Sequence, residues 1–207
     1  ALSVEIASSK FSYIESDEDV HSAIERGLVE KIGSVGGFIR TGRSRNDLVI
    51  TDFKLYLIDH LLNVAHLVNQ LAQTILDVAG RNIEVVSPGF THLQHAQPIS
   101  FGHELAKHAH GLLRDISRIE DWLNRNSLSP FGASALAGSP LQLDPESIAE
   151  GLGFDGVLAN SIDAVSDRDF VAEGLSTLAI IGVHLSKIGE EFTIWNSKEF
   201  NWVQLDD

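Results

Sequence analysis

The chain has 207 residues, of which 43% are hydrophobic and 21% are charged, and its formal net charge at pH 7 is −14. This composition is typical of a globular protein with one large domain or two small ones. The acidic balance argues against non-specific binding to nucleic acid or to an anionic membrane surface, and the absence of cysteine excludes disulfides, thiolate nucleophiles and Cys-ligated zinc.

The sequence does not indicate secretion or insertion into a membrane. Its most apolar stretch, residues 178–185, is too short to span a bilayer, and we recognise no signal peptide near the N-terminus. The absence of cysteine is compatible with a reducing compartment. We therefore expect a cytoplasmic protein with no membrane partner.

The first elements are short. Residues 1–17 are polar and mixed, and we expect them to be irregular. Residues 17–28 predict a helix, because acidic residues occupy its first turn and apolar residues then recur with helical spacing. Asp19 and His21 form a small polar cluster at its start. Three glycines between residues 33 and 37 should then interrupt the chain.

Three arginines, Arg40, Arg43 and Arg45, lie within six residues of this acidic chain, just before a long apolar-periodic segment that begins at about Leu48. The N-terminus of a helix attracts anions through its free N–H groups and its dipole. The arrangement therefore predicts a local site for an anionic ligand.

Two interpretations of this arginine cluster remain open. Ser44, Arg45 and Asn46 could grip a carboxylate, since arginine matches carboxylate geometry with two parallel hydrogen bonds. Alternatively, Asn46 or Asp47 could simply cap the helix while the arginines pair with nearby carboxylates of the protein.

Residues 48–79 contain no glycine or proline, and their apolar residues recur every three or four positions. Such a helix would be about 48 Å long. Gly80 should end it. A helix of this length belongs in an elongated bundle rather than in a small compact domain.

A loop bounded by prolines is expected at residues 87–98, with Pro98 as the first residue of a helix that continues to about residue 125. Two glycines inside that helix, Gly102 and Gly111, suggest close approach to another helix. Thr91 and His92 lie in the loop. His92 could exchange a proton near neutral pH, or it could simply satisfy loop carbonyls.

The last third of the chain should be a connection, a short helix and a long helix. Residues 129–141 indicate a connection, and the short helix should begin near residue 144 and end at Gly151 or Gly153. Residues 169–195 predict a helix that is apolar almost all round and hence buried on every side. We found no convincing strand pattern, so the fold class is predicted to be all-α.

Another polar cluster precedes that last helix: Asp163, Asp167, Arg168 and Asp169. Capping with local ion pairs is the alternative to a ligand-binding role. All the polar clusters lie at helix ends, so in a bundle of antiparallel helices they are predicted to converge at the tips.

Four motifs in the chain resemble those of argininosuccinate lyases, which belong to the fumarase/aspartase superfamily together with the delta-crystallins. The likeness extends from about residue 17 to residue 207. The motifs are Asp19-Val20-His21-Ser22-Ala23-Ile24-Glu25, Thr41-Gly42-Arg43-Ser44-Arg45-Asn46-Asp47, Thr91-His92-Leu93-Gln94-His95-Ala96-Gln97-Pro98 and Asn160-Ser161-Ile162-Asp163-Ala164-Val165-Ser166-Asp167-Arg168-Asp169-Phe170.

The resemblance implies cleavage of argininosuccinate to arginine and fumarate by β-elimination, without a cofactor or metal. His92 matches the histidine of the family's acid–base pair. The residues that match substrate-binding positions or line the family's site are Asn46, Thr91, Ser44, Arg45, Asp19, His21 and Arg168. The alternatives are a crystallin-like structural protein on the same fold, or a superfamily lyase acting on adenylosuccinate or fumarate.

The resemblance also implies an architecture: an elongated long-helix bundle that forms the multi-helix core of a homotetramer, with each active site assembled from three subunits. Residues 1–40 would be the end of an N-terminal helical domain, and residues 41–207 an incomplete central bundle domain. We expect the family's flexible loop, which carries its catalytic serine, to lie beyond residue 207. Leu48 stands where the family's motif usually has a glutamine.

Overall fold

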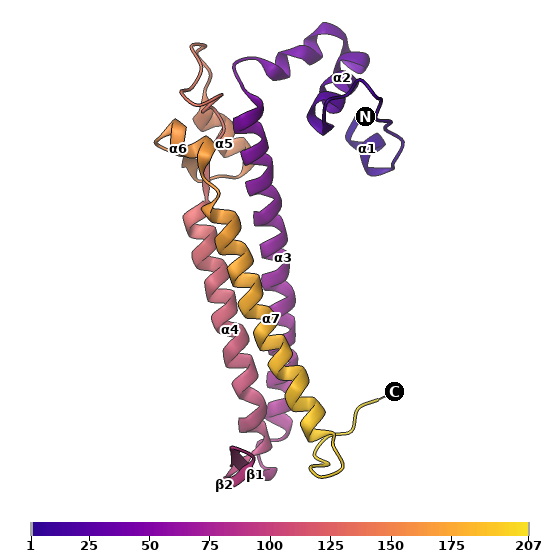
Figure 1. Ribbon diagram of the computed structural model, residues 1–207, viewed down its shortest axis with the longest axis vertical. Coiled ribbons are helices and arrows are strands. Elements are labelled where there is room, and N and C mark those ends of the chain that lie inside the picture. The colour runs from indigo at the N-terminus through magenta and orange to yellow at the C-terminus, as the bar shows by residue number, and fades with distance from the viewer. Residues whose placement is uncertain (1, 207) are drawn as a thin grey trace.

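Three long helices run side by side in the computed structural model, which describes residues 2–206 (Figure 1). They are α3 (Arg45–Arg81), α4 (Phe101–Asn126) and α7 (Asp169–Trp195). With 37 residues, α3 is about 55 Å long at the usual helical rise. The prediction of three long helices is confirmed, and the described part of the chain is mostly helical.

Apolar residues spaced three or four apart on these helices form the core between them. On α4 the buried positions follow this spacing closely, because residues three and four apart share one helix face. The fully buried indole of Trp122 also donates a hydrogen bond to the carbonyl oxygen of Phe170 at 2.8 Å, which joins α4 to the start of α7. The core residues are Leu61, Val68, Ala72, Ile75, Ala79, Leu105, Ala109, Leu112, Ile119, Trp122, Phe170, Ile181 and Trp195.

The two ends of α3 differ from the expectation. Ser44, rather than Asn46 or Asp47, is the N-cap, and Asp47 completes a capping box with it. Gly80 does not end the helix, since it lies inside α3 and Asn82 is the C-cap. A single glycine costs a helix only about 1 kcal/mol, which tertiary packing readily offsets.

The loop expected at residues 87–98 is instead a β-hairpin made of β1 (Val86–Thr91) and β2 (Gln94–Ser100). Both strands are edge strands, where proline is tolerated, so Pro98 lies in β2 and does not begin α4. Ser100 caps α4 by accepting a hydrogen bond from the backbone N–H of His103 at 3.1 Å.

A cluster of short elements covers the end of the bundle where α3 begins (Figure 1). It contains α5 (Pro145–Leu152), α6 (Ser161–Ser166) and a small parallel sheet of β3 (Leu128–Ser129) and β4 (Gly156–Val157). As predicted, the short helix ends at a glycine: Gly153 adopts a left-handed φ of 85°.

The N-terminal elements are α1 (Leu2–Ala7), α2 (Val20–Ile32) and the 3-10 helix η1 (Gly33–Arg40). The expectation of irregular structure throughout residues 1–17 is therefore wrong for α1. Arg26 of α2 holds the connecting segment by donating to both carboxylate oxygens of Asp17, each at 2.9 Å. This pairing lowers the pKa of Asp17 to about 2.

The sequence predicts that α7 is buried on every side, and this prediction is wrong. The packed face of this helix lies against α4, whereas the side chains of Leu175 and Val183 on its other face are 61% and 66% exposed. By length and composition alone, α7 could cross a membrane, which the stretch 178–185 could not. A core helix of a bundle passes the same test when its second apolar face is covered by another element.

We predict that Gly102→Ala destabilises the fold. A Cβ at Gly102 would lie 2.4 Å from the carbonyl oxygen of Ala79, so α3 and α4 could not keep their present contact. We expect the free energy of unfolding to fall by about 1–3 kcal/mol.

Gly80→Ala is the matched control, because no atom lies within 4 Å of a Cβ built there. This variant should be unchanged or up to about 1 kcal/mol more stable, since alanine favours helix. Thermal unfolding of both variants measures the difference, and equal stabilities would contradict the close approach.

Candidate functional site

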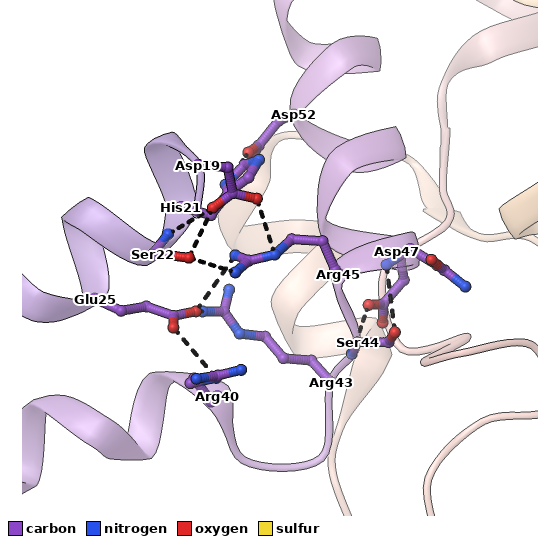
Figure 2. A network of polar contacts seen from close by, with 11 residues as sticks. Asp19, His21, Ser22, Glu25, Arg40, Arg43, Ser44, Arg45, Asp47 and Asp52 are labelled. Carbon is purple, nitrogen blue, oxygen red and sulfur yellow. Dashed lines mark hydrogen bonds and ion pairs between the residues drawn. The ribbon is translucent and has the colours of Figure 1, made fainter. Parts of the chain in front are cut away.

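Three arginine side chains gather around Glu25 of α2, between the end of η1 and the beginning of α3 (Figure 2). Arg40 Nε lies 3.2 Å from Glu25 Oε2, while Arg43 Nη2 and Arg45 Nη1 lie 3.2 Å and 3.7 Å from Glu25 Oε1. Of the two interpretations left open by the sequence, the pairing of the arginines with carboxylates of the protein is therefore observed, and a ligand-binding role stays a prediction. Glu25 was not singled out from the sequence, because its 15 to 20 residues of separation from the arginines give no local signal.

Asp19 and Arg45 form the second half of this cluster. Arg45 Nε lies 3.2 Å from Asp19 Oδ2, and Arg45 Nη2 donates to Ser22 Oγ at 3.0 Å. Asp19 is also the N-cap of α2, and its Oδ1 accepts the backbone N–H of Ser22 at 2.8 Å. That hydrogen bond is the main reason why the pKa of Asp19 is lowered.

His21 extends the same cluster toward α3. Its Nδ1 lies 3.5 Å from Asp52 Oδ2, and burial raises the pKa of the Asp52 carboxyl. Asp19, His21, Ser44 and Arg45, which the sequence placed in two separate clusters, thus share one site. The structure brings them together because side chains of α2 and its N-cap reach the first turns of α3 (Figure 2).

The cluster borders an open cavity of about 400 Å³. Three arginines and one carboxylate, that of Glu25, line this cavity at the mouth of α3, and Asp19 pairs with Arg45 beside it. A cationic wall beside the N-terminus of a long helix suits an anionic ligand. The lining residues are Glu25, Arg40, Arg43, Ser44, Arg45, Leu48, Ser134 and Ala135.

Asp47 fixes the far wall of this cavity. Its side chain is completely buried, and its Oδ1 accepts the backbone N–H of Ser44 at 3.0 Å. Its Oδ2 accepts the backbone N–H groups of Gly132 and Ser134 at 3.2 and 2.9 Å. The segment 129–141, which the sequence suggested was only a connection, is therefore held against the site.

Asn46 also contacts that segment, because its Nδ2 donates to the carbonyl oxygen of Ala135 at 3.0 Å. Its amide thus joins the first turn of α3 to the segment 129–141, while Asn46 itself is not among the residues that line the cavity. Among residues 2–206, no group of three or more His, Asp or Glu side chains is arranged to hold a metal ion.

Arg168 lies at the same end of the bundle as Asn46. It is the N-cap residue of α7, and its Nη1 donates to the carbonyl oxygens of Asp167 and Val165 at 2.6 and 3.2 Å. Local capping, the alternative to ligand binding for this polar cluster, is observed at Asp167, because its Oδ1 accepts the backbone N–H of Asp169 at 2.8 Å. The guanidinium of Arg168 remains exposed.

Thr91 and His92 lie at the other end of the bundle, at the tip of the β1–β2 hairpin (Figure 1). Asn46 is in the first turn of α3 and the hairpin follows its last turn, so the two are about 50 Å apart along the helix. The expectation that the polar clusters converge is therefore wrong for Thr91 and His92 within one chain.

The hairpin turn has an unusual backbone. His92 and Leu93 both have a left-handed φ, 54° and 58°, as in a type I′ turn. Such turns usually use Asn-Gly, so the sequence lacked the expected hairpin signal. Side chains other than glycine or asparagine rarely adopt this conformation, and such strain is frequent at functional sites. The exposed His92 rims a second cavity of about 240 Å³.

A family model described as Lyase matches residues 4–207. The chain is 53% identical over 206 residues to an argininosuccinate lyase of Frankia casuarinae, covering all of this chain and 44% of the relative. It is 51% identical over 201 residues to an argininosuccinate lyase of Acidothermus cellulolyticus, covering 97% of this chain and 41% of the relative.

Solved structures of EDDS lyase are similar to this chain as well. The crystal structure of EDDS lyase in complex with formate has a TM-score of 0.88 and 31% sequence identity over 99% of this chain and 41% of that chain. A variant of EDDS lyase with bound fumarate has a TM-score of 0.86 and 31% identity, over 99% of this chain and 39% of that chain. The chain spans less than half the length of the relatives it matches.

We predict that Asp47→Ala destabilises the protein by about 2–4 kcal/mol, because three backbone N–H groups would lose their acceptor. Asp59→Ala on the same helix is the control, since its side chain is 89% exposed, and it should change stability by less than about 0.5 kcal/mol. Denaturant unfolding compares the two variants. Similar losses in both would show that Asp47 does not anchor the segment 129–141.

Proposed function

The chain belongs to the lyase family, and from this premise we propose that the protein containing it cleaves argininosuccinate to arginine and fumarate by β-elimination. The observation that carries the proposal is the arginine-lined cavity at the mouth of α3, to which the motif 41–47 contributes Arg43, Ser44 and Arg45. The similarity of the whole chain to argininosuccinate lyases supports the choice of substrate.

The cavity suits a substrate with several carboxylates. We propose that Arg45, Ser44 and Asn46 bind a carboxylate of argininosuccinate at the helix mouth, with Asp19 and His21 beside them. In β-elimination a base removes a Cβ proton, a carboxylate-stabilised carbanion forms, and the C–N bond then breaks. Donors that are already in place stabilise the negative charge that accumulates on the carboxylate. This proposal requires no cofactor.

We assign His92 to the acid–base pair and Thr91 to substrate binding. Because the hairpin lies about 50 Å from Asn46 along the helix, His92 must reach the cavity of another copy. The exposed apolar face of α7 supports such self-association, and we propose a homotetramer. Arg168, at the same end as Asn46, would bind a further anionic group of the substrate.

We also propose the domain division expected from the sequence. Residues 1–40 would belong to an N-terminal helical domain, and residues 41–207 to the central helical bundle. In this arrangement α7 is a bundle helix rather than a membrane span, and the protein is cytoplasmic.

Fumarate release tests the activity. The full-length protein should produce fumarate from argininosuccinate, as followed by fumarate absorbance, and His92→Asn should lower kcat by about a hundredfold or more. His66→Asn, an exposed histidine on α3, should leave turnover unchanged. A folded tetramer that yields no fumarate would favour a crystallin-like structural role instead.

Mixing of subunits tests the shared site. Full-length His92→Asn and Asn46→Ala should each be nearly inactive, but subunits of the two variants unfolded and refolded together should regain turnover. Some sites would then combine an intact His92 from one chain with an intact Asn46 from another. The double variant refolded alone is the control and should stay inactive. No recovery in a well-folded mixed tetramer would contradict a site built from several chains.

A further inference from the structure

Lys54 of α3 is a buried cation that sequence analysis did not single out. Its side chain is 2% exposed, and its Nζ lies 3.8 Å from Asp167 Oδ2. The ammonium also lies over the ring of Phe170, 5.3 Å from the ring centroid. Burial lowers the pKa of Lys54, while Asp167 and Asp163 favour its charged form.

Both oxygens of the Asp167 carboxylate are engaged. Oδ2 faces Lys54, and Oδ1 accepts the backbone N–H of Asp169, which begins α7. The carbonyl oxygen of the same residue accepts Nη1 of Arg168 at 2.6 Å. Lys54 therefore holds the side chain of Asp167. The backbone carbonyl of Asp167 in turn holds the guanidinium of Arg168.

Lys54 also lies seven residues, about two helical turns, after Asp47 and on the same face of α3. Asp47 anchors the segment 129–141 beside the cavity, and Lys54 anchors the junction between α6 and α7. One helix face thus determines where Asn46 and Arg168 stand relative to each other.

Stability alone does not require a lysine here. A buried ion pair is often no more stabilising than well-packed apolar side chains of similar volume, because both charges must lose their hydration. A methionine would fill nearly the same space without that cost. The charge therefore points to a role in holding Asp167 in one orientation.

We propose that Lys54 is a positioning residue that acts through Asp167 to place Arg168 for an anionic group of the substrate. This inference rests on the proposed function. If Arg168 binds the substrate and the transition state equally, loss of its position should raise KM and leave kcat nearly unchanged.

The test uses the full-length protein and argininosuccinate. Turnover by the wild type is measured first, so failure of the proposed function would be seen before any variant is compared. Lys54→Met should raise KM roughly tenfold with kcat within about twofold. Lys10→Met, an exposed lysine in the N-terminal segment, is the control and should change neither constant.

A double-mutant cycle distinguishes positioning from general packing. Arg168→Gln alone should raise KM, and adding Lys54→Met to it should raise KM no further. If the single variant Lys54→Met does not fold, the double variant Lys54→Met/Asp167→Asn is used instead, because it removes both charges. The double variant then takes the place of Lys54→Met in every comparison. An unchanged KM, or an equal rise in KM with and without Arg168, would overturn the proposal.

Discussion

The buried carboxylate of Asp47 is the contact on which the arrangement around the candidate site depends. One oxygen completes the capping box with Ser44 and so determines where α3 begins. The other holds the backbone of Gly132 and Ser134, which lie more than 80 residues further along the chain. A carboxylate with three backbone donors replaces its lost hydration, so it can be completely buried. The helix mouth and the cavity wall are therefore parts of one structure.

The charges of the site are balanced rather than simply basic. The arginines that stand out in the sequence are oriented by Glu25 and Asp19, and the carboxylates of Asp47 and Asp52 lie close to them. Arginines held in this way do not need to be ordered when a ligand binds. Lys54 and Asp167 repeat the pattern in the interior, where one buried cation orients the carboxylate next to Arg168.

The length of α3 imposes a second constraint. It places the arginine cluster and the hairpin with His92 at opposite ends of a bundle that is about 55 Å long. A chemistry that needs both must join different copies of the chain. The apolar residues that remain exposed on α7 are in keeping with a helix that has a second packing partner.

The three long helices, the residue types of the site and the resemblance carried by the four motifs could all be predicted from the amino-acid sequence. Helical periodicity and motifs are local signals, so they can be recognised without knowing the fold. The folded chain was needed to show which carboxylates orient the arginines, that Asp47 and Lys54 hold distant segments, and that residues 86–100 form a hairpin. Those features join residues far apart in the chain, or place His92 and Leu93 in a backbone conformation that their side chains do not signal. They therefore depend on how the helices pack.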